Sequence, residues 1–290
     1  LVSKISLVAT GDVRVLLTGE TGSGKELAAR AIHSMGRRRK KPFVTVNCGA
    51  IPRDLVESEL FGHNKGAFTG AHEDRKGCFE EAHGGTLFLD EVAELSPVGQ
   101  TALLRVLEEG MIRRVGASKS IPVDVRVVAA THRNLREVVR SGLFREDLLH
   151  RIAVVEIRVP PLRERRGDIG LIARHMIVEL SQRMGRRPPA LSRDVITRLV
   201  AYQWPGNVRE LRNALENALI RSQGQELRVE HLALGEESVE TAVGSTMAEM
   251  EKRHIAEVMA SCGGNKVQAA KVLKISRSTL YEKIKSLGIE

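Results

Sequence analysis

Seven residues near the start of the chain have the types and spacing of a loop that binds phosphate groups. They are Gly19, Glu20, Thr21, Gly22, Ser23, Gly24 and Lys25, and they fit the pattern G-x-x-x-x-G-K. Glycines at these positions let backbone N–H groups surround phosphate oxygens, and the lysine supplies a positive charge for the β- and γ-phosphates. An ordinary glycine-rich turn is the alternative. The apolar run before the loop and the helical pattern after it favour nucleotide binding.

The residue after this lysine differs from the usual motif. A Ser or Thr hydroxyl normally contacts Mg²⁺ at this position, whereas this chain has Glu26. A metal ion would therefore depend on other ligands.

Two neighbouring acids, Asp90 and Glu91, follow the apolar residues 87–89. An α/β ATPase places its carboxylates at the C-terminal end of a buried strand. We expect Asp90 to hold Mg²⁺, directly or through water, and Glu91 to polarise the attacking water. A solvated acidic loop is the alternative, but the phosphate loop about 65 residues earlier favours catalysis.

Three arginines could stabilise the negative charge that develops during phosphoryl transfer. Arg145 and Arg151 lie six residues apart in a helical pattern, and Arg209 begins a helix after a Pro-Gly turn. Surface salt bridges are the alternative for the first two arginines. Arg209 could reach a nucleotide from a helical lid or simply cap the fold.

The C-terminal segment has the pattern of a basic helix-turn-helix. Residues 263–287 carry six Lys or Arg side chains and one acid, a net charge of +5. Asn265 can cap a helix over residues 266–273, and Ser276 can cap a second helix that ends at residue 287. Leu280, Ile284 and Leu287 form the apolar stripe of that second helix.

Polar and basic side chains of the second helix lie away from this stripe and suit base edges and phosphates. They are Arg277, Ser278, Thr279, Tyr281, Lys283 and Lys285. A helical protein-interaction module with a solvated basic face is the alternative to DNA binding.

Elements that could position these residues alternate along the first half of the chain. Strands are predicted over residues 13–18, 43–47, 86–90, 125–130 and 154–159, with helices over 27–35 and 99–109 between them. This alternation predicts an α/β fold with a parallel sheet covered by helices on both faces. Helices alone are predicted over residues 169–184, 192–202 and 208–222. We therefore expect an ATPase subdomain at 1–167, a helical lid at 168–234, a linker at 235–245 and an all-α helix-turn-helix domain at 246–290.

Composition limits the remaining possibilities. The 290 residues are 42% hydrophobic and 3% aromatic, which suits a core of Leu, Val, Ile and Ala. The formal charge of +9 is weak evidence for a polyanionic partner. Three cysteines without a Cys-x-x-Cys pair argue against a disulfide framework or a zinc site and favour a cytoplasmic protein. Neither a membrane span nor a signal peptide is visible, and the initial Leu1 suggests that an N-terminal regulatory part is missing.

One hexapeptide connects these features to a known family. Gly66, Ala67, Phe68, Thr69, Gly70 and Ala71 spell GAFTGA, the signature of sigma-54-dependent activators. Residues 57–63, 84–91, 160–165 and 204–211 also resemble that family, which belongs to the AAA+ ATPases, and the C-terminal segment resembles a Fis-type helix-turn-helix. The resemblance extends from the phosphate loop to the C-terminus.

The resemblance implies further roles by position. A Glu follows the lysine in this family too, which accounts for Glu26. Asn47 is similar to the asparagine that pairs with the catalytic glutamate, and Arg209 to the second sensor. Arg145 and Arg151 are similar to arginine fingers that act on the neighbouring subunit's nucleotide. Phe68 and Thr69 would form the tip that touches the sigma factor, flanked by hinge-like glycines.

The same resemblance implies an ATPase that uses ATP and Mg²⁺ and works as a ring, usually a hexamer. Such activators bind upstream double-stranded DNA and open promoters held by sigma-54 RNA polymerase. An apolar side of residues 247–260 would pair two subunits on a palindromic site. Two alternatives remain: a DNA-binding regulator with nucleotide-responsive oligomerisation but little turnover, and an AAA+ chaperone or helicase-like motor, which would leave GAFTGA unexplained.

Four positions differ from the family pattern. His132 stands where the first sensor usually has Asn, and His150 stands where Asp is common between the two arginines. His132 could still form a hydrogen bond, and neither histidine has neighbours that suggest a metal site. Cys78 replaces a larger residue, which we interpret as a packing variant. Lys274 replaces the usual turn glycine, so a residue with a side chain would have to adopt a strained backbone angle there.

Overall fold

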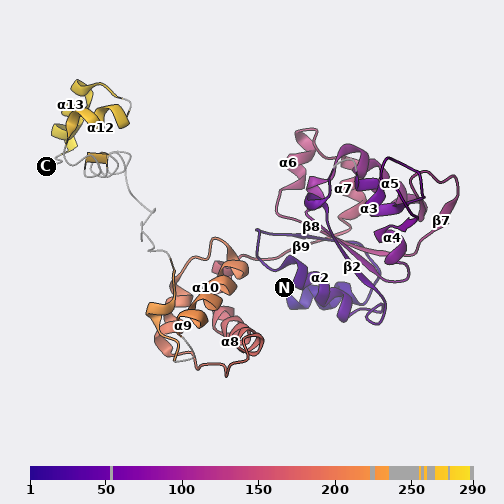
Figure 1. Cartoon of the computed structure of the whole chain (residues 1–290), viewed down its shortest axis with the longest axis horizontal. Coiled ribbons are helices and arrows are strands. Elements are labelled where there is room, and N and C mark those ends of the chain that lie inside the picture. Colours follow the sequence, from indigo (N-terminus) through magenta and orange to yellow (C-terminus); the bar gives the residue numbers. More distant parts are fainter. Residues whose placement is uncertain are drawn as a thin grey trace. The chain divides into compact units, whose positions relative to one another are not determined.

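The computed structural model describes residues 1–52, 55–222, 226–234, 255, 258–259, 265–273 and 275–287. The chain divides into two units, residues 1–234 and residues 235–290. Figure 1 shows the elements of each unit along the chain.

The first unit is built on a five-stranded parallel sheet. Its strand order is β2 (Phe43–Asn47), β5 (Thr86–Asp90), β8 (Arg126–Thr131), β1 (Val15–Thr18) and β9 (Val155–Arg158). These are the five strands predicted from the apolar runs, and their ends differ by at most two residues from the prediction. All six residues of β8 are buried, as expected for a parallel strand covered on both faces.

Helices cover the two faces of this sheet. One face packs its buried side chains against α1 (Val2–Ala9) and α2 (Lys25–Ser34), and the first of these helices was not predicted. The elements packed on the other face are α3 (Val56–Phe61), α4 (Cys78–Glu81), α5 (Pro97–Glu109), α6 (Leu135–Arg140) and α7 (Glu146–Ile152). In Figure 1, α2 lies on the opposite side of the sheet from α3, α4 and α5. The predicted layered α/β architecture is confirmed.

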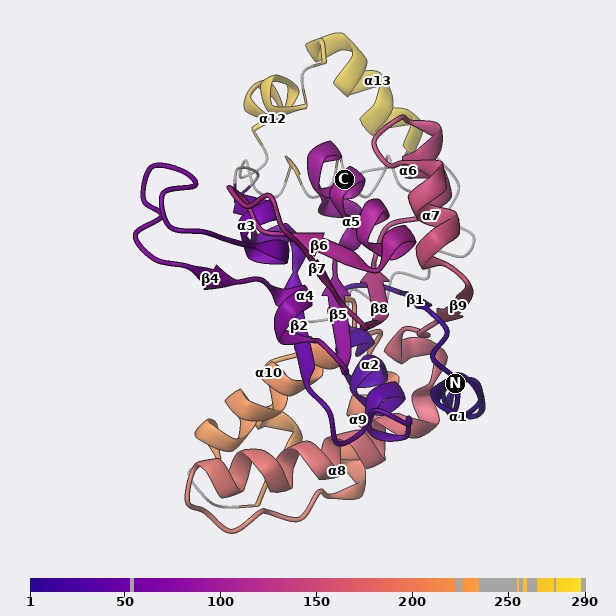
Figure 2. The same ribbon diagram turned by 90° about the vertical axis from the view of Figure 1, so that its right-hand side faces the viewer.

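Two small antiparallel pairs were not predicted. One joins β3 (Gly62–His63) to β4 (Arg75–Lys76), and the other joins β6 (Met111–Arg113) to β7 (Ser120–Pro122). The segment between β3 and β4 carries the GAFTGA hexapeptide, and Figure 2 shows this part of the chain extending away from the sheet. The backbone N–H of Asn64 donates to Val115 O at 3.0 Å, which ties the first pair to the segment between β6 and β7.

Three helices form the predicted lid after the sheet. They are α8 (Arg166–Arg183), α9 (Arg193–Ala201) and α10 (Asn207–Arg221). Their shared core surrounds Trp204, which is completely buried. Short 3-10 helices occur at Cys48–Ala50, Val92–Glu94, Leu162–Glu164 and Val229–His231.

The second unit contains the two predicted helices of a helix-turn-helix, α12 (Lys266–Val272) and α13 (Arg277–Leu287). Both predicted caps are present: Asn265 Oδ1 accepts from Gln268 N at 3.2 Å, and Ser276 Oγ accepts from Thr279 N at 3.1 Å.

Ile255 is buried with Leu280, Ala269 and Ala270, and Val258 and Met259 pack against this cluster. This part of the predicted subunit-pairing surface is therefore used within the chain. Lys274, the proposed linker 235–245 and most of residues 247–260 lie outside the described residues.

Candidate nucleotide-binding site

The phosphate loop, residues 19–25, connects β1 to α2 as predicted. Gly22 has a φ of 76° and Gly24 a φ of 100°, a region that residues with side chains rarely adopt. Helix α2 begins at Lys25, so its N-terminal N–H groups lie at the end of the loop. Ser23 Oγ is buried and has no hydrogen-bond partner among the described residues. This combination of a helix N-terminus and an unpartnered hydroxyl fits a phosphate group.

Lys25 is 6% exposed and lies across the loop. Its Nζ donates to Gly19 O at 2.9 Å and to Glu20 O at 3.3 Å, and it lies 3.6 Å from Glu91 Oε1. The ammonium group therefore joins the phosphate loop to the acidic pair, where a phosphate charge would be neutralised.

Asp90 ends β5 and lies opposite Asn47, the last residue of β2, in the register of the sheet. Burial, together with the nearby charge of Glu91, raises the pKa of Asp90. A divalent cation would stabilise the ionised carboxylate and reverse this shift. The described residues contain no cluster of three or more acidic, His or Cys side chains that could hold a metal. If an Mg²⁺ ion binds here, Asp90 is the residue that would hold it, and phosphates and water would have to supply the other ligands.

Glu91 has an unusual backbone and two engaged carboxylate oxygens. Its φ of 51° places a non-glycine residue in the left-handed region, a form of strain that occurs at functional sites. Oε2 accepts from His132 Nδ1 at 2.7 Å and from His132 N at 3.2 Å, while Oε1 faces Lys25.

The expected pairing of Asn47 with Glu91 is not seen in the structure. Asn47 Oδ1 instead accepts from Gly49 N at 3.0 Å and caps the 3-10 helix Cys48–Ala50. His132, the residue directly after β8, makes the hydrogen bonds to Glu91 that the structure shows.

The N-terminus of α10 lies directly against the phosphate loop. Val208 N donates to Gly22 O at 3.0 Å, and Asn207 Nδ2 donates to Thr21 O at 3.2 Å and to Glu20 Oε2 at 3.1 Å. Asn207 is fully buried, and its Oδ1 accepts from Leu162 N at 2.8 Å. The sequence prediction did not include Asn207. Its position after Pro-Gly was a signal, because Asn tolerates the positive φ of 55° found here.

Two further arginines that were not predicted as site residues hold the same loop. Arg163 forms an ion pair with Glu20, and Arg165 donates to Ser23 O at 2.5 Å. The hydrogen bonds from Arg163 and Asn207 lower the pKa of Glu20 to about 2. A Cβ atom on Gly22 would lie 3.1 Å from Arg209 Cβ, so the predicted second-sensor residue starts beside the phosphate loop.

The two predicted arginine fingers, Arg145 and Arg151, lie away from the phosphate loop. The guanidinium group of Arg145 pairs with Asp147 at 2.7 Å, and Arg151 Nε donates to Leu107 O at 3.4 Å. Within the described residues, neither arginine contacts residues 19–25 of its own chain. Glu26, the departure from the usual motif, pairs with Arg30 at 2.7 Å on the surface of α2.

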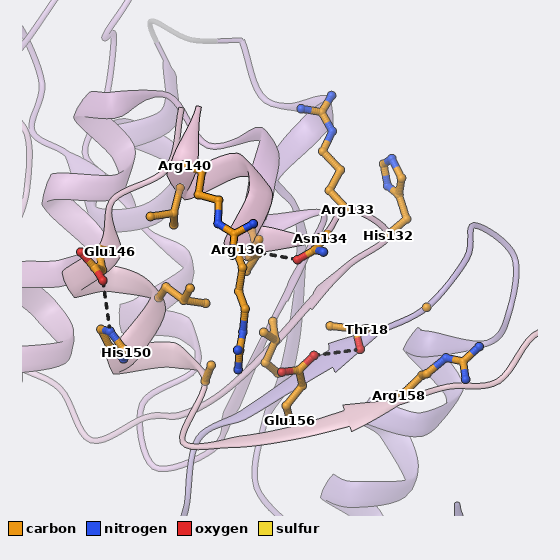
Figure 3. A pocket seen from close by; sticks show the side chains of 16 residues that line it. Thr18, His132, Arg133, Asn134, Arg136, Arg140, Glu146, His150, Glu156 and Arg158 are labelled. Atoms are coloured by element: carbon orange, nitrogen blue, oxygen red, sulfur yellow. Dashed lines mark hydrogen bonds and ion pairs between the residues drawn. The ribbon is translucent and has the colours of Figure 1, made fainter. Parts of the chain in front are cut away.

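A cavity of about 810 Å³ adjoins the first glycine of the phosphate loop. Its walls come from β1 and β9, from residues 132–134 after β8, and from α6 and α7. Figure 3 shows His132, Arg133 and Asn134 along one part of this wall, with Thr18 and Glu156 joined by a hydrogen bond of 3.3 Å. The cavity gives the His132 side chain, which is 40% exposed, open space on one side.

The GAFTGA loop, residues 66–71, is closed mainly by bonds within itself. Gly66 N donates to Ala71 O at 2.9 Å, and Ala71 N donates to Phe68 O at 3.0 Å. Ala71 is buried, whereas Phe68 remains 37% exposed with its ring 5.0 Å from that of His63. The structure thus presents an aromatic side chain on a loop with few outside contacts.

The side chains predicted for DNA binding lie on α13 in different environments. Arg277 is exposed and Tyr281 is 53% exposed, with Lys266 Nζ 5.2 Å from its ring centre. Lys283 is half-buried, and the hydroxyl of Thr279 lies 2.7 Å from Ser276 Oγ. The side chains of Ser278 and Lys285 lie outside the described part of the chain.

Three families match consecutive parts of the chain. Residues 1–158 match the sigma-54 interaction domain, residues 163–244 the AAA+ ATPase lid domain, and residues 246–287 the bacterial regulatory protein family of Fis type. None of the described helices is long and apolar enough to cross a membrane.

Relatives match almost all of the chain. The transcriptional regulatory protein ZraR of Escherichia coli K12 is 46% identical over 98% of this chain, and FlbD of Caulobacter vibrioides is 44% identical over 96%. Crystal structures of NtrX from Brucella abortus in complex with ADP and with ATP are 37% and 36% identical, each with a TM-score of 0.74 over 99% of this chain. The chain spans 66% of the length of each of these proteins.

Proposed function

Because the chain belongs to the sigma-54 interaction family of AAA+ ATPases and carries a lid and a Fis-type region, we propose that it is an ATP-driven transcription activator. It binds DNA upstream of a promoter and uses ATP hydrolysis by a ring of subunits to remodel sigma-54 RNA polymerase. The observation that carries this proposal is the meeting of Lys25, Glu91 and the N-terminus of α10 at the phosphate loop.

The residues of this site have distinct roles in the proposed hydrolysis. The phosphate loop and Lys25 bind the phosphates of ATP, and Arg209 reaches the nucleotide from the lid. Asp90 would hold Mg²⁺, and the bound ion would supply positive charge for the phosphates. Glu91 accepts a proton from the attacking water as the water's oxygen bonds to the γ-phosphorus, while the bond from the γ-phosphorus to the β–γ bridging oxygen breaks and ADP leaves. The buried, partly desolvated environment of Asp90 and Lys25 strengthens these charge interactions.

A second copy of the chain supplies the remaining positive charge at the nucleotide. Arg145 and Arg151 do not contact the phosphate loop of their own chain, so we assign them to the nucleotide of a neighbouring subunit. A ring, hexameric as in the family, completes every site in this way. This arrangement makes hydrolysis depend on assembly.

The proposal also assigns a partner to each of two surfaces, the GAFTGA loop and the basic side of α13. Phe68 and Thr69 at the GAFTGA loop contact sigma-54, where an exposed aromatic ring can be buried by a partner. Arg277, Ser278, Thr279, Tyr281, Lys283 and Lys285 contact double-stranded DNA, palindromic if two copies pair. Work on promoter DNA takes place in the bacterial cytoplasm.

A regulator with little turnover is the second candidate function. The specific observation in its favour is that both oxygens of Glu91 are engaged, by Lys25 and by the unusual His132. A glutamate that stayed in these contacts would keep both oxygens directed at protein groups and not at an attacking water.

ATP hydrolysis measured against protein concentration separates the two candidates. We expect activity per subunit to rise steeply with concentration in this chain and to fall at least about 100-fold in Glu91→Gln, because a general base typically contributes 10²–10⁴-fold. Absence of hydrolysis at every concentration, with DNA still bound, would favour the second candidate.

A further inference from the structure

Arg14 lies at the end of β1 that is farther from the phosphate loop. It directly precedes the strand, and its carbonyl oxygen accepts from Val155 N, at the start of β9, at 3.2 Å. Gly19 lies five positions later, roughly 16 Å away along an extended chain. The half-buried side chain of Arg14 is therefore anchored in the sheet but does not belong to the phosphate-binding site.

The guanidinium group of Arg14 reaches the C-terminal ends of two helices. Nη2 donates to Leu107 O, in the last turn of α5, at 2.8 Å, and Nη1 donates to Arg151 O, in the last turn of α7, at 3.4 Å. Carbonyl groups in the last turn of a helix lack partners within the helix and form the negative end of its dipole. A planar guanidinium group can serve two such acceptors at once, so Arg14 joins the ends of α5 and α7.

Helix α7 depends on contacts of this kind for its position. It has only seven residues, and short helices are held mainly by their tertiary contacts. Its buried side chains, Leu148 and Ile152, belong to the same apolar cluster as Leu103 and Leu107 of α5. These apolar contacts fix the inner face of α7, and the bond from Arg14 fixes its last turn, where Arg151 begins.

The side chain of Arg151 competes with Arg14 for one acceptor. Arg151 Nε also donates to Leu107 O, but at 3.4 Å, and this side chain is exposed. Burial lowers the pKa of Arg14, and the positive charge of Arg151 lowers it further. Because the shorter bond to Leu107 O belongs to Arg14 and like charges repel, the guanidinium group of Arg151 is held only weakly within its own chain.

We propose that Arg14 is a positioning residue for Arg151. It holds the main chain of Arg151 at the end of α7 and occupies the carbonyl group that would otherwise retain the Arg151 side chain. The inference rests on the proposed action of Arg151 at the nucleotide of a neighbouring subunit. Arg14 acts through Arg151 and not on the nucleotide.

Two substitutions of Arg14 test this role. Arg14→Met keeps much of the stem and removes every donor, and we expect it to lower kcat by about 10–100-fold, as a catalytic group displaced by about 1 Å would. Arg14→Lys keeps the charge but not the planar fork, so its kcat should lie between those of Arg14→Met and the unsubstituted chain.

Nucleotide binding and a matched arginine serve as controls for these variants. Binding of a fluorescent ATP analogue should stay within about 3-fold in Arg14→Met, because the phosphate loop is distant from Arg14. Arg105→Met removes an exposed arginine of α5 and should leave kcat within about 2-fold.

Mixtures of subunits show on which subunit Arg14 acts. Lys25→Ala subunits lack the lysine that binds phosphate but can supply Arg151, whereas Arg151→Ala subunits bind ATP and cannot supply it. We expect the mixture of these two to hydrolyse more ATP than either alone. Lys25→Ala should likewise raise hydrolysis by Arg14→Met subunits at least about 3-fold, because an intact neighbour then supplies a positioned arginine. Lys25→Ala subunits that also carry Arg14→Met should rescue Arg151→Ala less.

The outcomes separate this inference from the proposed function. Full kcat in Arg14→Met would overturn the positioning role, and so would a low kcat that Lys25→Ala subunits do not raise. If Arg14→Met does not fold, Arg14→Lys takes its place in the same mixtures, and the same two results are decisive. Absence of rescue between Lys25→Ala and Arg151→Ala would instead reject the proposed shared site.

Discussion

The phosphate loop and the GAFTGA loop both use left-handed glycines, but their surroundings are opposite. A Cβ atom on Gly22 would lie 2.5 Å from Gly206 O, whereas a Cβ atom on Gly66 or Gly70 would meet no atom within 4 Å. Gly22 is thus required by a close approach of two backbones. Gly66 and Gly70 are required only by their φ angles of 81° and 107°.

The hydrogen bonds of the two loops differ in the same way. Residues 20–23 receive bonds from Arg163, Arg165, Asn207 and Val208, all distant in sequence. The GAFTGA loop bonds mainly to its own backbone and leaves Phe68 exposed. The phosphate loop is therefore held by bonds from the lid, whereas the GAFTGA loop makes few bonds to the rest of the chain.

Gly22→Ala should give the largest effect. The added methyl group combines left-handed strain of about 1–2 kcal/mol with an overlap of about 1–3 kcal/mol against the Gly206 backbone. We expect the free energy of unfolding to fall by about 2–5 kcal/mol and ATP binding to weaken at least tenfold. Denaturant unfolding and nucleotide titration measure both quantities. If Gly22→Ala lowered the free energy of unfolding no more than Gly66→Ala does, that result would contradict the close approach of the Gly22 and Gly206 backbones.

Asn207→Ala should give the second-largest loss of stability and ATP affinity. The substitution leaves the buried N–H of Leu162 without its acceptor, which costs about 1–3 kcal/mol. It also removes two donors to the phosphate loop, so ATP affinity should fall with stability. Asn213→Ala, at an exposed position of the same helix, is the matched control and should leave both quantities nearly unchanged.

Gly66→Ala should have a smaller effect, confined to the GAFTGA loop. With open space around the added methyl group, only the backbone strain of about 1–2 kcal/mol remains. Calorimetric unfolding should show this modest loss, and amide hydrogen exchange should increase for residues 64–72 alone. Increased exchange at the phosphate loop would show that the two loops are not independent.

The smallest expected effect is a pH dependence carried by Glu20. Its folded pKa of about 2 lies below the ordinary value of 4.5, so its stabilising contribution is complete above pH 4.5 and is lost as pH falls towards 2. Since Glu20 and Arg163 are 42% and 38% exposed, the contribution should stay below about 1 kcal/mol. The stability difference between the chain and Glu20→Gln should narrow between pH 5 and pH 3, and a constant difference would count against the ion pair.

The same contrast separates what the sequence could predict from what it could not. The five strands were predictable because each is an apolar run next to a turn or a helical pattern, as in residues 86–90. The phosphate loop and the acidic pair were predictable because their chemistry requires particular residues at fixed spacing. The pairs β3–β4 and β6–β7 were not, because strands of two or three residues leave no periodic pattern.

Contacts between residues far apart in the sequence account for most of the site residues that the sequence did not predict. Asn207 meets Glu20 across 187 positions of the sequence, and no local pattern predicts such a partner. Asn47 is expected to donate to Glu91 through its amide N–H₂, whereas the bond that the structure shows is the local one from Gly49 N to its carbonyl oxygen. His132 differs from the family pattern in the sequence, but only the fold shows that its Nδ1 lies 2.7 Å from Glu91 Oε2.

The burial of Trp204 gives the chain a built-in optical reporter. It is the only tryptophan of the 290 residues, its Nε1 donates to Leu199 O at 2.7 Å, and its carbonyl oxygen accepts from Asn207 N at 2.8 Å. A rearrangement that changes the bond between Asn207 N and Trp204 O would alter the surroundings of this tryptophan. Its emission wavelength and quenching would report such a rearrangement within the lid in real time, without a label, in the unsubstituted chain.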